Sequence, residues 1–180
     1  MSLLDEIKVK LALLRGRDPQ YRLFGANVHR YRLSQTLSVA QVAAFEQEWQ
    51  VRLPEGYRDF LLQVGGGGAG PYYGVLPLGY HKAALSLLRE PFPHGGDWNE
   101  EHLSDDEYLD DSLTRGAMRI CNTGSGGYEL LVVTGAARGT IWADGRYANQ
   151  GLLALPHSHN PLRRMDFLDW YLDWLERGLA

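Results

Sequence analysis

The apolar residues of this 180-residue chain change their spacing twice, and these changes decide the fold class. Up to about residue 64 they recur at helical spacing. Between residues 117 and 155 they form short runs separated by glycine turns, a pattern typical of consecutive antiparallel strands. Met165–Arg177 returns to helical spacing. Helices, then strands, then a closing helix predict a single α+β domain, with a central antiparallel sheet flanked by N-terminal and C-terminal helices.

Three helices are expected before the sheet. The first is Ser2–Arg15, which Ser2 can cap. A second begins at Ser38, where Gln41 stands at capping-box spacing. Proline suits the first turn of a new helix, so a third is expected over Pro54–Val64. The shorter elements expected are a strand at Gly74–Leu78, a helix at His81–Leu88, and strands at Ala117–Cys121, Tyr128–Val133, Thr140–Ala143 and Gly151–Leu155. Poor alternation in Tyr128–Val133 predicts a central strand that is covered on both faces.

Composition excludes several classes of protein. With 44% hydrophobic and 11% aromatic residues, most of the chain is not disordered. It has no apolar run of about 18 residues, so no membrane span is expected. The first ten residues carry acids where an export leader carries basic residues, so we expect a cytoplasmic protein. A net charge of −4 argues against a nucleic-acid partner, and the oligomeric state is left open.

Charge is distributed unevenly along the chain. Up to Arg32 there are seven basic and three acidic residues, whereas Asp97–Asp111 contains eight acids and no Lys or Arg. Repulsion among these acids predicts an exposed, poorly packed acidic insertion at about residues 91–112. It is either a solvated loop or a surface that attracts a basic partner. Trp98 in this insertion is either an exposed binding anchor or an aromatic that folds back onto its own domain.

The motifs that suggest chemistry have structural interpretations in this context. Gly65–Gly70 contains GxGxxG, but it follows a helix and precedes a strand, the reverse of a dinucleotide-binding loop. Gly124-Ser125-Gly126 lacks the first glycine of a nucleophile elbow and is interpreted as a turn. His157 and His159 can share one side of an extended segment, but no spacing links them to further metal ligands. Cys121 is expected to be a buried, inert thiol. We therefore predict no catalytic residue, no cofactor and no metal.

One block of the sequence resembles a known family. LPEGYRDFLLQVGGGGAGPYYGVLPL, residues 53–78, is similar to the signature of the SUKH superfamily, in its group named after a yeast cell-wall-assembly regulator. In that signature Leu-Pro-x-x-Tyr-x-x-Phe-Leu leads into a glycine-rich turn and a strand ending in Pro-Leu. Later pieces agree in order, so the resemblance covers about residues 38–175. Residues 1–37 are then an N-terminal helical extension of a single SUKH-like domain, 1–180.

The resemblance implies a non-enzymatic protein-binding domain, because many bacterial members are immunity proteins that neutralise toxins. The function expected here is toxin neutralisation, and the alternative is an intracellular regulatory or scaffold module without a toxin partner. The expected partner is a toxin domain with a basic active-site groove, which the acids would occupy. The predicted contact residues are Trp98, Glu100, Glu101, Asp105, Asp106 and Glu107, with Tyr72 and Tyr73 beside the glycine turn as a second contact.

Overall fold

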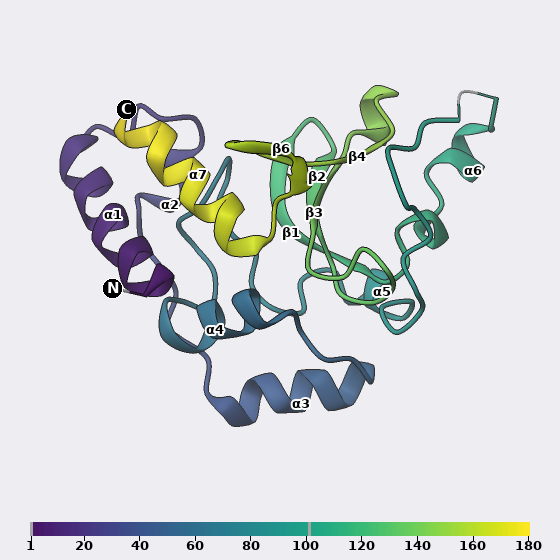
Figure 1. Cartoon of the computed structure of the whole chain (residues 1–180), viewed down its shortest axis with the longest axis horizontal. Helices are drawn as coiled ribbons and strands as arrows, with labels where there is room; N and C mark the ends of the chain where they lie inside the picture. Colours follow the sequence, from purple (N-terminus) through teal and green to yellow (C-terminus); the bar gives the residue numbers. More distant parts are fainter. Residues whose placement is uncertain (1, 101) are drawn as a thin grey trace.

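A four-stranded antiparallel meander forms the centre of the protein. The computed structural model describes residues 2–100 and 102–180. The strands follow one another in the order β1-β2-β3-β4, each paired with the next, and helices lie at both ends of the chain (Figure 1). The predicted α+β class is therefore confirmed. The strands are β1 (Ala117–Gly124), β2 (Gly127–Val132), β3 (Ile141–Asp144) and β4 (Leu152–Ala154).

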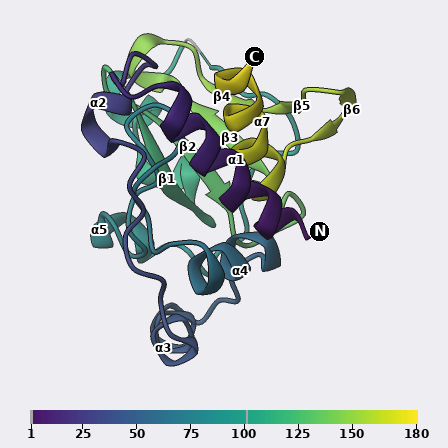
Figure 2. The same ribbon diagram turned by 90° about the vertical axis from the view of Figure 1, so that its left-hand side faces the viewer.

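Two of the four long helices begin at the caps that the sequence predicts. Ser2 caps α1 (Leu3–Arg17) and Ser38 caps α3 (Val39–Trp49), each through a capping box. Pro54 precedes α4 (Glu55–Gln63) as its N-cap residue rather than standing in its first turn. The closing helix, α7 (Phe167–Leu179), packs along α1, and the two lie side by side in Figures 1 and 2.

Both faces of the sheet are covered, as the pattern in β2 predicts. Leu130 and Val132 contribute to a smaller cluster around Trp142. The alternate residues Leu131 and Val133 face the main core, to which α1, α3, α4 and α7 all contribute. Because successive side chains of a strand point to opposite faces, β2 needs apolar residues at every one of these positions.

The glycine run joins three pieces of backbone. Gly68 forms bridges with Leu33 and with Val75, which in turn pairs with Cys121. A Cβ on Gly68 would lie 2.4 Å from the Arg32 carbonyl oxygen, which confirms that the run serves close backbone packing. The predicted strand at Gly74–Leu78 is wrong, because only Val75 forms bridges there. Glycine with positive φ on one side and proline on the other limit the pairing.

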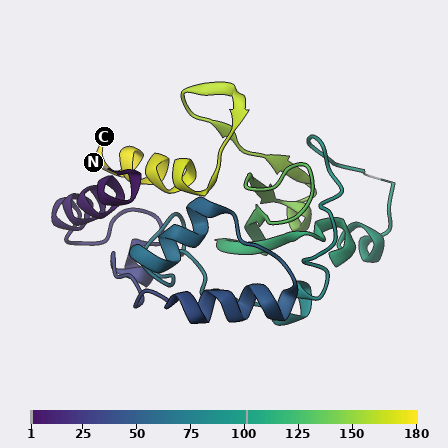
Figure 3. The same ribbon diagram turned by 60° about the horizontal axis from the view of Figure 1, so that its bottom comes forward.

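The remaining elements are short. The predicted helix at His81–Leu88 is reduced to one turn, because left-handed backbone at His81 moves its start to Lys82 and the backbone after Leu85 continues as turns. A hairpin that was not predicted, β5–β6, projects from the body of the protein (Figures 2 and 3). In residues 2–100 and 102–180, no helix has both the length and the apolar character needed to cross a membrane. The short elements are α2 (Ala26–His29), α5 (Lys82–Leu85), α6 (Asp105–Tyr108), η1 (Asp111–Thr114), η2 (Arg146–Ala148), β5 (Pro156–His157) and β6 (Asn160–Arg164).

Candidate interaction surface

The acidic insertion is attached to the sheet rather than loosely packed, so the prediction of poor packing is wrong. Phe92 is buried with its ring 5.0 Å from that of Trp142. The backbone N–H and C=O of Trp98 both bond to Leu152, at 2.8 Å each. The Trp98 ring is half-buried and stacks on Tyr108 at 5.4 Å. Of the two roles left open for Trp98, the structure shows the second: it folds back onto its own domain.

Arg146 holds the insertion in place. Its buried guanidinium bonds both carboxylate oxygens of Asp144, at 2.8 and 2.9 Å. It also donates to the backbone carbonyls of Tyr108, at 3.2 Å, and Asp110, at 3.0 Å. One side chain therefore fixes the end of α6 against η2. Sequence reasoning missed Arg146, since nothing in the pattern around it distinguishes a buried arginine from an exposed one.

The predicted acids differ in whether their carboxylates are available to a partner. Glu100, Asp105 and Asp106 are exposed. Glu107 accepts hydrogen bonds from the Ser104 backbone N–H and hydroxyl, at 3.0 and 2.7 Å, and these bonds lower the pKa of its carboxyl. Glu107 therefore caps α6, and Glu101 lies outside the described residues. The acids border a hollow lined by Asn99, Glu100, Leu103, Asp105, Tyr108 and Asn149, hereafter the acidic hollow.

Tyr72 and Tyr73 belong to an exposed aromatic patch that also contains Phe24. The Phe24 ring lies 6.1 Å from that of Tyr72 and 5.3 Å from that of Tyr73. Phe24 is 63% exposed, although sequence reasoning did not select it. The two loops are locked together, since a Cβ on Gly25 would lie 1.7 Å from the Tyr72 carbonyl oxygen. Beside the patch is a second hollow, lined by Leu23, Phe24, Pro71, Tyr72, Trp174, Arg177 and Gly178.

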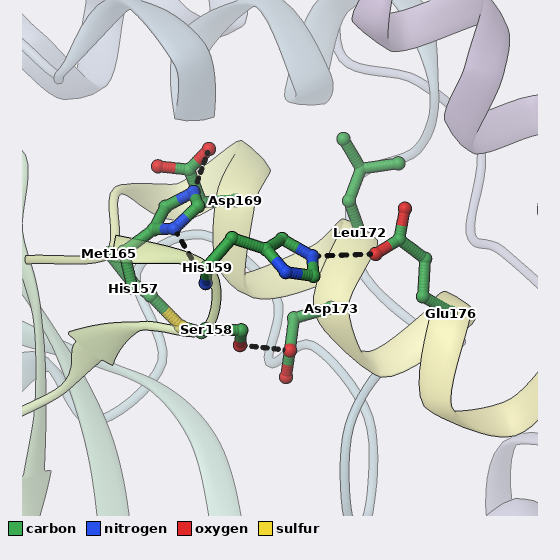
Figure 4. A pocket seen from close by; sticks show the side chains of 8 residues that line it. All are labelled: His157, Ser158, His159, Met165, Asp169, Leu172, Asp173 and Glu176. Atoms are coloured by element: carbon green, nitrogen blue, oxygen red, sulfur yellow. Dashed lines mark hydrogen bonds and ion pairs between the residues drawn. The ribbon is translucent and has the colours of Figure 1, made fainter. Parts of the chain in front are cut away.

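His157 and His159 face the acidic side of α7 (Figure 4). His157 Nε2 lies 3.6 Å from Asp169 Oδ1, and His159 Nε2 lies 3.7 Å from Glu176 Oε2. Between them, the Ser158 hydroxyl bonds to Asp173. Three successive hairpin residues thus meet three acids along one helix, and these pairs attach the β5–β6 hairpin to α7.

These histidines do not assemble a metal centre. Each ring is directed at a different acid, and within residues 2–100 and 102–180 no group of three potential ligands is placed to hold an ion. Glu176 also receives a hydrogen bond of 2.6 Å from Lys10, which lowers the pKa of its carboxyl. The arrangement is therefore a set of surface contacts between a hairpin and a helix.

Besides Asp144, the sheet contains the buried titratable groups Cys121 and Glu129. Cys121 is buried, its Sγ donates to the Pro71 carbonyl at 3.1 Å, and burial raises the pKa of the thiol well above its usual range. This confirms the expected buried thiol. Glu129 accepts a 2.6 Å hydrogen bond from the Trp170 indole, and burial raises the pKa of its carboxyl to about 7.

The family assignment agrees with this geometry. The model of the SMI1 / KNR4 family (SUKH-1) matches residues 36–154, about two thirds of the chain. The chain belongs to the SUKH-1 family. No curated protein and no solved structure matches it.

The SUKH-1 match covers the glycine turn, the acidic insertion and the four-stranded sheet. Tyr72, Tyr73, the acids and Arg146 all lie inside the matched range, whereas Phe24 lies before it. The β5–β6 hairpin and α7 follow it. Both predicted contacts therefore lie within the range that the family model matches.

Proposed function

We propose that this SUKH-1 protein is a non-enzymatic, cytoplasmic immunity protein that binds a bacterial toxin and blocks its active-site groove. The observation that carries the proposal is the fixed acidic surface. Glu100, Asp105 and Asp106 are exposed on a segment without Lys or Arg between residues 97 and 111. Arg146 holds that segment through backbone carbonyls and leaves these carboxylates free.

The physical argument is electrostatic and geometric. A toxin that acts on a phosphate backbone needs a groove lined with cations, and carboxylates can occupy the same sites. Complementary charge also accelerates encounter, which an inhibitor of a fast-acting enzyme requires. Because the insertion is already ordered, little conformational entropy is lost when it binds.

The test begins with the gene neighbourhood: the proposal predicts an adjacent toxin gene, whose toxin domain is purified in a catalytically inactive form, and the absence of such a gene favours the regulatory alternative. The dissociation constant of this toxin domain is measured with the parent chain and with the double variant Glu100→Lys/Asp106→Lys. Each reversal places like charges together, so a loss of about tenfold per residue, about 100-fold in all, is expected. Glu107 is left unchanged because it caps α6.

The matched control is Glu48→Lys/Glu90→Lys, which makes the same change in net charge at exposed residues elsewhere. We expect its affinity to stay within about threefold of the parent, because neither residue lines the acidic hollow and interactions of exposed charges are weakened by salt. Equal affinities for both double variants would reject the acidic mechanism. Failure of the parent chain to bind the toxin domain would reject the immunity function and favour the regulatory alternative.

A further inference from the structure

The aromatic patch and the acidic hollow are joined by one row of neighbouring residues. Tyr73 lies over the β1–β2 turn, where a Cβ on Gly124 would be 3.3 Å from its ring. On the other side of this turn a Cβ on Gly126 would be 2.9 Å from Cγ of Tyr147. The turn therefore lies between Tyr73 and Tyr147. Because it carries glycine at both contact positions, the two rings approach its backbone directly.

The row continues from Tyr147 to the acids. Asn149, two residues further along, accepts a 3.2 Å hydrogen bond from the Asn99 amide through its backbone carbonyl. Asn99 and Asn149 are two of the residues that line the acidic hollow, together with Glu100 and Asp105. These contacts connect the loop before α2 with α6, which lie toward opposite ends of the protein in Figure 1.

The composition of this surface is typical of a protein interface. Phe24 and Tyr147 are 63% and 67% exposed, so their rings contribute little to the core of their own domain. Exposed aromatic residues bordered by charged ones are the usual anatomy of a binding site for another protein. The surface is also closely packed from below, since Gly25 lies against the Tyr72 backbone and Gly126 lies against the Tyr147 side chain, with no room for a Cβ at either glycine.

We infer that Phe24, Tyr72, Tyr73 and Tyr147, here called the aromatic row, form one continuous interface with the acidic hollow, and that Tyr147 is its central anchor. The inference rests on the proposed function. It assigns the toxin surface a definite chemistry: an apolar ridge that packs on the aromatic row, next to a cluster of Lys or Arg that faces the acids.

The negative charge of the acids favours a basic protein surface over a second copy of the chain or a nucleic acid as the partner. A second copy of the chain, packed symmetrically about Tyr147, would place Glu100 and Asp105 opposite the aromatic end of the other copy rather than opposite a cluster of Lys or Arg. A nucleic acid would bring phosphates against the same carboxylates. A basic protein surface with an apolar ridge satisfies both ends of the interface.

The experiment measures the affinity of the inactive toxin domain for Tyr147→Ser, Phe24→Ser and Leu162→Ser. Leu162 is the matched control, because it is 97% exposed on the β5–β6 hairpin, away from this surface. We expect the Tyr147 change to weaken binding by about 30-fold or more, as for a central anchor. A loss of about fivefold is expected for Phe24 at the edge and none for Leu162. The midpoint temperature of unfolding should be the same for all three variants, since each side chain is exposed.

The results separate the inference from the function on which it rests. Losses for both aromatic variants, with hydrogen-exchange protection of residues 24, 72–73 and 147 together with 102–107 in the complex, support one continuous interface. Unchanged affinity for either aromatic variant, while Glu100→Lys/Asp106→Lys still weakens binding, overturns the continuous interface and leaves the immunity function intact. A parent chain that does not bind the toxin domain overturns both.

Discussion

Arg146→Met tests whether one buried ion pair holds the acidic insertion. The substitution keeps the length and apolar stem of the side chain but removes the charge. Asp144, only 7% exposed, then loses both bonds from the guanidinium and keeps only the 3.3 Å hydrogen bond that the backbone N–H of residue 146 donates to its carboxylate. The carbonyls of Tyr108 and Asp110 lose their donor at the same time.

The expected magnitude follows from leaving one buried charge unpaired. Removing one member of a buried pair costs about 3–5 kcal/mol of the free energy of unfolding. For a domain of this length about 1 kcal/mol shifts the midpoint temperature by 2–4 °C, so a decrease of about 6–20 °C is expected. The double variant Asp144→Leu/Arg146→Met should regain more than half of this loss, because it leaves no unpaired charge.

Urea unfolding and thermal melts of the single and double variants provide the measurement. Arg163→Met is the control, since this arginine pairs with Asp166 and Asp169 but its side chain is 55% exposed, so a loss below about 1 kcal/mol is expected. Hydrogen exchange in Arg146→Met should increase first at residues 105–110. The reasoning is refuted if Arg146→Met resembles Arg163→Met, or if the double variant is less stable than the single one.

Three further changes probe the core and the aromatic patch. Glu129 has a pKa of about 7 in the folded chain against about 4.3 unfolded, so the free energy of unfolding should fall by about 3 kcal/mol as pH rises from 4.5 to 7. Glu129→Gln should abolish this fall in urea titrations at pH 5 and 8. The buried Tyr57 hydroxyl has no hydrogen-bond partner among the described residues, so Tyr57→Phe should raise the free energy of unfolding by about 1 kcal/mol in urea titrations. In Gly25→Ala the new Cβ would clash with the Tyr72 carbonyl, and residue 25 has positive φ. The substitution should therefore lower the free energy of unfolding by more than about 1 kcal/mol in urea titrations, and it should weaken toxin binding in the affinity measurement.

Local signals explain why the long elements could be predicted from the sequence. The capping boxes at Ser2 and Ser38 and the apolar spacing of α7 are complete within a few residues, so no distant contact is needed to recognise them. The β5–β6 hairpin lacks such a signal, because its strands are largely exposed and show no alternation of apolar and polar residues.

The site could be predicted only in part, because exposure is decided by distant packing. Trp142 and Tyr147 are both aromatic and lie five positions apart, yet the first is buried and the second is 67% exposed. The charge pattern predicted the exposure of Glu100, Asp105 and Asp106, but repulsion among the acids suggested loose packing. Burial of Phe92 and the four hydrogen bonds of the Arg146 guanidinium outweigh that repulsion.

The hydrogen-bond partners of Arg146 explain how a segment of like charges can be ordered and still keep its carboxylates available to a partner. Among the described residues, the ion pair of Asp111 with Arg119, at 3.5 Å, is the only one that involves a carboxylate of Asp97–Asp111. Arg146 neutralises Asp144, which lies outside the insertion, and reaches the insertion through neutral carbonyls. The negative potential of Glu100, Asp105 and Asp106 is therefore not cancelled by the contact that fixes them. An arginine that instead paired with these acids would order the insertion equally well, but it would cancel the charge that the proposed basic partner would recognise.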